Sequence, residues 1–278
     1  IKMIKKDFNN IEYSDDYFSN FIDGLNTKNL IMKKDAKFDD GVIIVCFYNN
    51  FENFAKKWME HYISIGIKNF VLVNNNSNDR SLNILKDYSK KVNISFWDIN
   101  EEYNCYKICG WKQKILEFYG AYHNFLIVDS DELFIYKDYE NIKFEDFLNK
   151  NRLSFIKSLV LDVYTNKKIF GGTLEDFNFV DRGTYKTSNN VPYIERFYGG
   201  PISRVLDINS SLQKIPYISY TGKEVCANNY FYYPWNINKK AKFCSYLLHY
   251  KLLNSNNKIS FYDKNISIPI SDIKFNFD

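Results

Sequence analysis

The fold is decided by residues 41–79, GVIIVCFYNNFENFAKKWMEHYISIGIKNFVLVNNNSND, which hold a strand, a helix and a second strand in immediate succession. GVIIVCFYNN (41–50) is a continuous apolar run that ends in polar residues, a pattern typical of a parallel strand buried on both faces. NFVLVNNNSND (69–79) repeats this pattern and runs into a loop rich in Asn, Ser and Asp. Two such runs predict neighbouring strands of one sheet.

Between the two runs, the apolar residues follow the period of a helix. Phe54, Trp58, Tyr62 and Ile65 are spaced three or four residues apart and would share one helix face. Gly66 follows at the position where a helix C-cap favours glycine. This segment therefore predicts the crossover helix that two parallel strands require.

The same alternation continues along the chain. A helix is predicted over 81–91, a third strand over 92–100 and another helix over 110–122, before a fourth strand begins at Phe125. This order predicts an α/β, Rossmann-like fold with a mostly parallel sheet flanked by helices. The short aromatic segments after about residue 150 predict a mixed α+β continuation of that sheet.

Polar residues follow each of the predicted strands. Asn49, the loop 74–79 and Asp98 follow the first three strands, and Asp129 and Asp131 follow the fourth. Ligands of parallel sheets bind beyond the carboxyl ends of the strands. We therefore expect these residues to border one crevice.

FLIVDSDELFIY (125–136) runs from four apolar residues straight into Asp129 and Asp131. Burying an unpaired carboxylate is unfavourable, so packing alone does not explain two of them. In an extended chain both side chains would point to one site and Ser130 would face away. Paired carboxylates suit Mn²⁺ or Mg²⁺, which share their other positions with phosphate oxygens. An ordinary turn capped by aspartate is the alternative interpretation.

The composition is that of a folded protein. The chain has 278 residues, 45% of them hydrophobic and 18% aromatic, and a formal net charge of +4. This charge is too small to predict nucleic-acid binding, but it is compatible with an anionic substrate and with peripheral contact with a membrane surface. The five cysteines form no CxxC pair, which indicates reduced thiols and a cytoplasmic location. We find no apolar run of membrane-spanning length and expect no secretory leader in this sequence.

The order of the segments resembles the GT-A glycosyltransferases of the family 2 type, and more narrowly their bacterial branch related to family 92. The resemblance begins with 41–79 and continues with GWKQKILEFYGAYHNFLIVDSDELF (110–134). It is carried further by LDVY, RFYGGPISRVL, LQKIPYISY and LLHYKLL. It divides the chain into an N-terminal extension (1–40), a GT-A domain (41–255) and a C-terminal tail (256–278). The domain consists of a nucleotide-sugar half (41–136) and an acceptor half (137–255).

The resemblance implies a metal-dependent, inverting, hexosyltransferase-like enzyme. Its donor would be a nucleotide sugar, its acceptor an oligosaccharide or lipid-linked glycan, and its cofactor Mn²⁺ or Mg²⁺. Its place would be bacterial surface polysaccharide synthesis, such as capsule or lipopolysaccharide, in the cytoplasm or at the inner face of the plasma membrane. No nucleic acid is expected as a partner.

The resemblance also implies roles for single residues. The loop from Asn74 would hold the nucleoside, Asp98 would approach the base or ribose, and Gln113 would brace the metal-side strand. Asn74 stands where the family usually has Asp, which leaves the nucleotide open. The residues predicted to bind the nucleotide sugar are Asn49, Asn74, Asn76, Asp79, Asp98, Gln113, Asp129 and Lys251.

YLLHYKLL (246–253) contains the third predicted metal ligand, His249, besides Asp129 and Asp131. An extended conformation would put His249 and Lys251 on one face, so that the imidazole binds the metal ion and the ammonium binds the diphosphate. A structural histidine packed between aromatic residues is the alternative for His249. Structural roles are expected for the other two histidines, His61 and His123.

Transfer to a hydroxyl group also needs a general base. Glu175 and Asp176 are the first candidates, because a Gly–Gly loop that could approach a ligand closely precedes them. Asp162 is the next candidate, and Asp181 and Glu195 remain open.

Two other functions use similar motifs. A phosphatase of the haloacid dehalogenase type carries its DxD on the first strand, whereas here three strands precede the motif and Leu133 follows it. A carbohydrate-binding module with structural Ca²⁺ is usually all-β, which the predicted alternation of strands and helices opposes.

Overall fold

The computed structural model describes residues 15–167, 173–183, 185–191, 194–208, 211–228, 230–254, 260–273 and 275. The helices are α2 Asp15–Asn26, α3 Glu52–Ser64, α4 Ser81–Tyr88, α5 Lys107–Tyr119, α6 Phe144–Asn151, α7 Gly200–Leu206 and α8 Asn236–Lys240, with short 3-10 helices η1 Leu174–Asp176, η2 Lys251–Asn254 and η3 Ile270–Asp272. The strands are β1 Leu30–Lys34, β2 Val42–Tyr48, β3 Asn69–Asn75, β4 Asn93–Ile99, β5 His123–Ile127, β6 Glu132–Tyr136, β7 Phe155–Asp162, β8 Tyr164–Thr165, β9 Phe177–Asp181, β10 Tyr185–Val191, β11 Ile194–Gly199, β12 Gln213–Tyr220, β13 Val225–Cys226, β14 Tyr232–Tyr233, β15 Lys242–His249 and β16 Ser267–Pro269.

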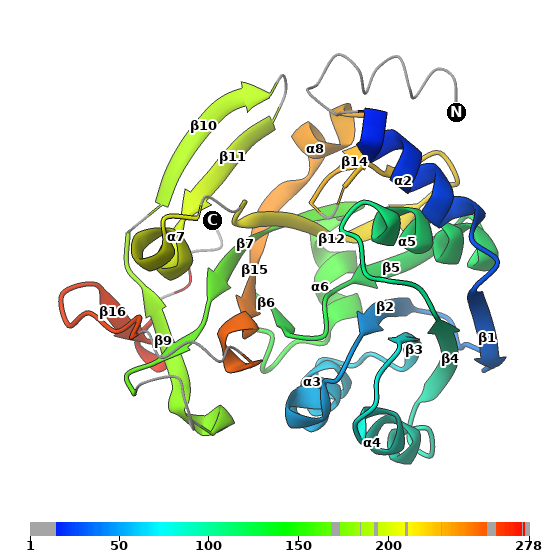
Figure 1. Ribbon diagram of the computed structural model, residues 1–278, viewed down its shortest axis with the longest axis horizontal. Helices are drawn as coiled ribbons and strands as arrows, with labels where there is room; N and C mark the ends of the chain where they lie inside the picture. Colours follow the sequence, from blue (N-terminus) through cyan, green and yellow to red (C-terminus); the bar gives the residue numbers. More distant parts are fainter. Residues whose placement is uncertain are drawn as a thin grey trace.

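The central sheet has nine strands in the order β1-β4-β3-β2-β5-β12-β7-β15-β6 (Figure 1). β4, β3, β2 and β5 are parallel neighbours. β7 and β15 are a second parallel pair, and the antiparallel strand β12 joins the two groups. β1 and β6 close the edges in antiparallel pairing. The predicted α/β class, with a mostly parallel sheet flanked by helices and a mixed second half, is confirmed.

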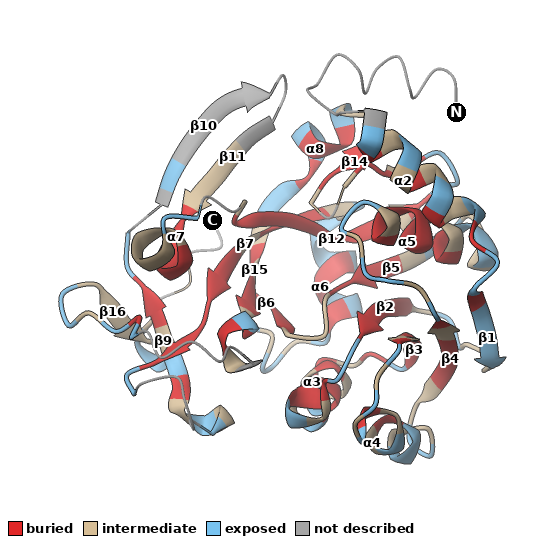
Figure 2. Cartoon of the chain, in the orientation of Figure 1, coloured by how far each residue is buried: buried red, intermediate tan, exposed pale blue. Residues whose placement is uncertain are grey.

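Helices cover both faces of the sheet because alternate strand residues point to opposite faces. In β2, Ile44 faces the core that contains Trp58 of α3, whereas Val45 faces the core that contains Trp111 of α5. Every residue of β2 is therefore buried, as Figure 2 shows for the central strands in general. Each large apolar side chain buried in this way contributes roughly 1.5–3 kcal/mol. The carboxyl ends of the parallel strands are consequently held firmly at one edge.

Part of the stretch expected to be an N-terminal extension packs onto this sheet. β1 pairs with β4, and α2 packs against α5 at a close helix crossing. Gly24 and Gly110 make this crossing possible, because a Cβ atom on Gly110 would lie 2.3 Å from the carbonyl oxygen of Phe21. Residues 15–34 thus support the layer that contains α5.

The segment 125–136 contains the end of one strand, a turn and a second strand. β5 ends at Ile127, and β6 begins at Glu132 and pairs with β15 at the far edge of the sheet. The four residues between them form a turn, in which the Glu132 amide donates to the carbonyl oxygen of Asp129 at 3.2 Å. The expected extended conformation is therefore wrong, and Ser130 does not face away, because it lines the same pocket as Asp129 and Asp131.

The remaining strands form small sheets beside the central one. β10 pairs with β11, β13 with β14, and β9 lies between β16 and β8. All five cysteines are free thiols. In the part of the chain that the structure describes, no helix is both long enough and apolar enough to cross a membrane.

Candidate active site

A cleft of about 360 Å³ lies beyond the carboxyl ends of β2, β3 and β5. It is the place where the strand order predicts a ligand. Four parts of the chain supply its polar side chains: the ends of β2 and β3, the turn between β5 and β6, and the end of β15. The residues that line it are Phe47, Tyr48, Asn49, Asn75, Tyr103, Ile108, Trp111, Asp129, Ser130, Asp131, Tyr230, His249 and Lys251.

Asp131, His249 and Asp162 form a line of three interacting side chains. His249 Nε2 lies 3.5 Å from Asp131 Oδ2, and His249 Nδ1 donates to Asp162 Oδ1 over 2.7 Å. The sheet sets this order, since His249 of β15 is the register partner of Asp162 of β7. The Tyr250 amide also donates to the carbonyl oxygen of Asp131 at 2.7 Å, which ties the turn to β15.

The electrostatics of this line favour a cation at Nε2. Burial lowers the pKa of His249, but the carboxylates of Asp131 and Asp162 raise it by more, so that it lies well above the usual histidine value. Asp162 is only 2% exposed and lies behind the ring, not in the cleft. Its Oδ1 holds the imidazole, and its Oδ2 has no hydrogen-bond partner among the described residues. A proton or a metal ion on Nε2 would equally satisfy the two flanking acids.

Asp129 is engaged differently from Asp131. Its two oxygens face two lysines: Lys112 Nζ lies 3.5 Å from Oδ1, and Lys214 Nζ lies 3.0 Å from Oδ2. Lys214 also lies 2.7 Å from Glu132 Oε2, and the same oxygen accepts a hydrogen bond from the Asp129 amide. Burial raises the pKa of Asp129, but Lys214 and Lys112 lower it to well below its usual range. Asp129 is therefore a firmly ionised carboxylate that already has counter-ions.

The walls of the cleft are aromatic. The rings of Phe47 and Trp111 stack at 6.1 Å, and Tyr103, 60% exposed, lies at the rim. Burial and the charge of Asp129 raise the pKa of Tyr103 to about 12. The Tyr48 hydroxyl and the Trp111 indole nitrogen are buried without a hydrogen-bond partner among the described residues. Unpaired donors beside a cleft suit a ligand with acceptor oxygens.

The predicted nucleoside loop is held mainly by its own hydrogen bonds. Asn74 donates to Asp98 Oδ1 at 3.3 Å and accepts from the Ser77 amide at 3.0 Å. Asp79 accepts from the backbone amides of Glu52 and Ser81, at the starts of α3 and α4. The side chains of Asn74, Asn76, Asp79 and Asp98 lie outside the lining of the cleft, whereas Asn49 lines it.

Gln113 faces away from the cleft. It is buried, donates to Glu117 and Tyr220, and accepts from the Cys226 amide of β13. It therefore braces β12 and β13 and not the strand that carries Asp131. The neighbouring residue, Lys112, points into the acidic cluster instead.

The structure does not bring the predicted bases into the cleft. Asp176 caps its own 3-10 helix through the Thr173 amide and is paired with Lys167, and Glu175 is exposed on the same short helix. Asp162 is covered by His249, a location that does not suit direct contact with a substrate. Asp181 is held by Arg204, and the side chain of Glu195 lies outside the described residues.

Sequence reasoning missed the buried lysines Lys112 and Lys214. Buried lysines are rare, and a lysine in an otherwise apolar strand such as QKIPYISY is the kind of signal that could have found Lys214. The partner of each lysine could not have been inferred, because Lys112, Lys214 and Asp129 come from separate elements. His61 contacts the Phe134 carbonyl oxygen, in keeping with a structural role, whereas His123 is exposed at the start of β5.

The donor set fits a hard divalent cation with only two protein ligands. Among the described residues, no three His, Cys, Asp or Glu side chains converge tightly enough to hold a metal ion by themselves. Asp131 and the Nε2 atom of His249 are the side-chain pair that faces the cleft, and Asp162 orients the imidazole from behind. Mg²⁺ and Mn²⁺ commonly take one or two protein ligands and complete their shell with water and substrate phosphate.

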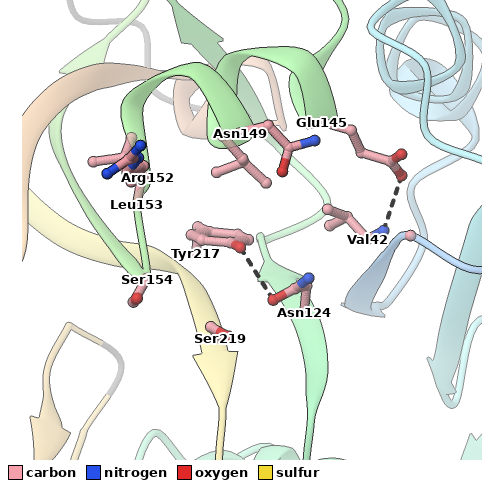
Figure 3. A pocket seen from close by; sticks show the side chains of 11 residues that line it. Val42, Asn124, Glu145, Asn149, Arg152, Leu153, Ser154, Tyr217 and Ser219 are labelled. Atoms are coloured by element: carbon pink, nitrogen blue, oxygen red, sulfur yellow. Dashed lines mark hydrogen bonds between the residues drawn. The ribbon is translucent and has the colours of Figure 1, made fainter.

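A larger hollow of about 460 Å³ lies at the opposite end of β5, beside α6 (Figure 3). Its one acid, Glu145, accepts a hydrogen bond from the Val42 amide, and Asn124 accepts one from the Tyr217 hydroxyl. None of the predicted site residues lines it. The cleft at Asp131, which combines acids, a histidine and lysines, is therefore the candidate active site.

No protein-family profile matches the chain, and no curated protein matches it either. Solved structures of S. aureus TarS are distantly similar. TarS 1-349 in complex with UDP-GlcNAc is 16% identical, with a TM-score of 0.33, over 47% of this chain and 38% of that one. TarS 1-349 alone is 18% identical, with a TM-score of 0.32, over 60% of this chain and 49% of that one. The chain thus spans less than half of TarS, and this similarity establishes neither a family nor a function.

Proposed function

We propose that this protein is a metal-dependent glycosyltransferase of the GT-A type that uses a nucleotide-sugar donor. The observation that carries the proposal is the line of Asp131, His249 and Asp162 at the mouth of a cleft beyond parallel strands. The aromatic walls and unpaired donors of the cleft suit a nucleoside, and its cationic side chains suit a diphosphate. The resemblance noted in the sequence points in the same direction.

Asp131 and His249 would hold Mn²⁺ or Mg²⁺ in this proposal. The ion supplies positive charge that neutralises the leaving nucleoside diphosphate. Asp162 keeps the Nδ1 proton of His249 in place, so that Nε2 presents its lone pair to the cleft. Asp129 is already paired with lysines and is left for a hydrogen bond to a ligand hydroxyl, such as that of a ribose.

Lys251 and the aromatic residues would position the donor. Lys251 lines the cleft from η2 and brings a second cation toward the diphosphate. Tyr48 and Trp111 line the cleft and would contact the nucleotide through their rings. The acceptor hydroxyl would enter the cleft from the solvent. The proposed acceptor is a glycan of a bacterial surface polysaccharide.

The arrangement of Asp129 disfavours the phosphatase alternative. A nucleophilic aspartate needs an oxygen that is free to attack phosphorus. Both oxygens of Asp129 instead face ammonium groups, those of Lys112 and Lys214. The helices on both faces of the sheet likewise disfavour an all-β carbohydrate-binding module.

The proposal is tested with Asp131→Asn and a panel of nucleotide sugars. We expect donor hydrolysis and transfer in the presence of Mn²⁺ for the wild type, and a loss of at least ~10²-fold in the variant, because a key contact to the ion is gone. The matched control is Asp87→Asn, at an exposed aspartate of α4, which should keep full activity. Circular dichroism checks the fold of both variants. Full activity of a folded Asp131→Asn protein would reject the metal role.

A further inference from the structure

Lys214 occupies an unusual position for a lysine. Its side chain is 3% exposed, and its ammonium group lies between Asp129 and Glu132, the first and last residues of the turn DSDE. A buried charge is tolerated only with well-placed partners of opposite sign. Here both partners are acids of the turn that carries Asp131. The turn that supplies the proposed metal ligand Asp131 therefore already has a resident cation beside it.

The ammonium group of Lys214 reduces the negative charge that the turn presents to a metal ion. Without Lys214, the carboxylate of Asp129, 42% exposed, would be available beside Asp131, and Glu132 would add a further negative charge. Three acids in four residues are a strong attraction for a divalent ion. With Lys214 in place, one positive charge is already shared between two of them.

We propose that Lys214 serves as an internal counter-ion that keeps Asp129 and Glu132 from binding a divalent ion. The protein ligands of the metal ion are then Asp131 and His249 alone. Because two ligands bind weakly, the ion binds firmly only together with a nucleoside diphosphate. Lys214 is thus a positioning residue for the proposed reaction. Lys112, which contacts Asp129 through its other oxygen, supports the same arrangement. This inference rests on the proposed function for the nature of the nucleotide, but not for its first test.

The first test measures Mn²⁺ binding without nucleotide, from the electron paramagnetic resonance signal of free Mn²⁺. Lys214→Met should bind Mn²⁺ about tenfold more tightly than the wild type or better, because removal of the ammonium group frees Oδ2 of Asp129 and leaves the turn more negative. A purely structural role predicts the opposite sign, since a disrupted turn would weaken metal binding.

Two variants serve as controls. Lys214→Arg keeps the charge and should bind Mn²⁺ as weakly as the wild type. Lys157→Met removes another buried lysine, one in β7 whose ammonium lies 4.8 Å from the centre of the Phe243 ring, and should leave Mn²⁺ binding unchanged. Equal or weaker Mn²⁺ binding by a folded Lys214→Met protein, relative to the wild type, would overturn the inference.

Lys214→Met leaves the buried Glu132 without its cation and Asp129 paired with Lys112 alone, and could therefore fail to fold. Lys214→Met combined with Glu132→Gln removes one charge of each sign and is measured in the same way. It should still bind Mn²⁺ more tightly than the wild type, because Oδ2 of Asp129 is freed, and an unchanged affinity would overturn the inference here too.

A second measurement needs no change at Lys214. In the presence of UDP, Asp131→Asn should raise the Mn²⁺ concentration for half-saturation by ~30-fold or more, whereas Asp129→Asn should change it by less than about threefold. Equal effects of the two variants would show that Asp129 is a metal ligand and would overturn the inference. If the wild type binds no nucleotide with Mn²⁺, the proposed function fails, but the measurement without nucleotide still decides the role of Lys214.

Discussion

Asp162 illustrates how a residue can be placed at a site without touching a ligand. Its carboxylate is buried, and its one hydrogen bond to a described residue goes to the Nδ1 atom of His249. The type and order of residues suggested a base, because an acid at a strand end usually faces the crevice. The pairing of β7 with β15 puts the histidine between this acid and the cleft. At the scale of single residues, the role thus depends on what covers the side chain.

We expect Asp162→Asn to weaken the use of the metal ion more than the chemical step. Loss of the charge behind His249 should raise the Mn²⁺ concentration for half-maximal activity by about 10–100-fold, as removal of such supporting acids typically does. The rate at saturating Mn²⁺ should change much less. A metal titration of activity separates these two quantities. A large fall in the saturating rate with an unchanged Mn²⁺ requirement would instead favour a direct role as base.

His61 should make the protein less stable in acid. Burial lowers its pKa to about 4, below the ordinary value near 6.5. Between these two pH values the unfolded chain binds more protons, so the free energy of unfolding falls as the pH drops through this window. From pH 7 to pH 5 this residue should cost about 2 kcal/mol. The measurement is urea unfolding of the wild type and His61→Gln at both pH values.

His61→Gln is the reference for the urea unfolding of the wild type. Its glutamine cannot gain a proton, so the stability advantage of the wild type over His61→Gln should shrink by about 2 kcal/mol from pH 7 to pH 5. A difference that stays constant would mean that His61 is not held in its neutral form.

At the scale of elements, α3 protects an exposed strand edge. β6 is the last strand of the central sheet, and its free edge would otherwise present unpaired backbone groups. The Tyr62 hydroxyl donates to the Glu132 carbonyl oxygen and accepts from the Phe134 amide, and His61 contacts the Phe134 carbonyl oxygen. The helix therefore covers this edge with side chains, next to the turn that carries Asp131.

The crossing of α2 and α5 gives a prediction at the same scale. In most helices Gly→Ala stabilises by roughly 1 kcal/mol. At Gly110, the added Cβ would lie 2.3 Å from the Phe21 carbonyl oxygen and 2.4 Å from the Leu25 amide nitrogen. We expect Gly110→Ala to destabilise the protein by about 1–3 kcal/mol, because the two helices must move apart. Chemical unfolding measures the change.

The control for helix propensity is Asn83→Ala on the exposed side of α4. It adds alanine without a clash and should be neutral or slightly stabilising. If Gly110→Ala also stabilises the protein, the close packing of α2 on α5 is not present in solution.

At the scale of the whole molecule, the ligands should stabilise the fold together. In the proposed function, nucleotide and metal ion would bind between elements from both halves of the central sheet. A ligand at 100 times its Kd adds about 2.7 kcal/mol. We therefore expect a rise in Tm of roughly 5 °C with Mn²⁺ and the matching nucleoside diphosphate. Either one alone should give a much smaller rise, and a chelator should abolish the joint effect.

A thermal-shift assay over several nucleoside diphosphates, with Asp131→Asn as control, checks this expectation. A shift by nucleotide that is equal with and without chelator would argue against the metal ion. A complete lack of any nucleotide shift would argue against the proposed function itself.

Much of the architecture could be predicted because its signals are local. The buried run of β2, the helical spacing of Phe54 to Tyr62 and the polar end of β3 depend on residues that are neighbours in the chain. The first four parallel strands and their helices follow from these signals, as does the edge of the sheet at which polar residues gather.

What only the tertiary structure decided is which charges meet at that edge. Lys112, Lys214 and Asp129 come from α5, β12 and the turn after β5, and no local pattern records that they are in contact. The same holds for Asp162 behind His249, which follows from the pairing of β15 with β7, and for the turn at Ser130, which follows from the pairing of β15 with β6. The sequence by itself determined the scaffold and the kinds of side chain at its edge, because these depend on periodicity and burial. Long-range strand pairing determined their partners, because the interaction of charges depends on distance in space.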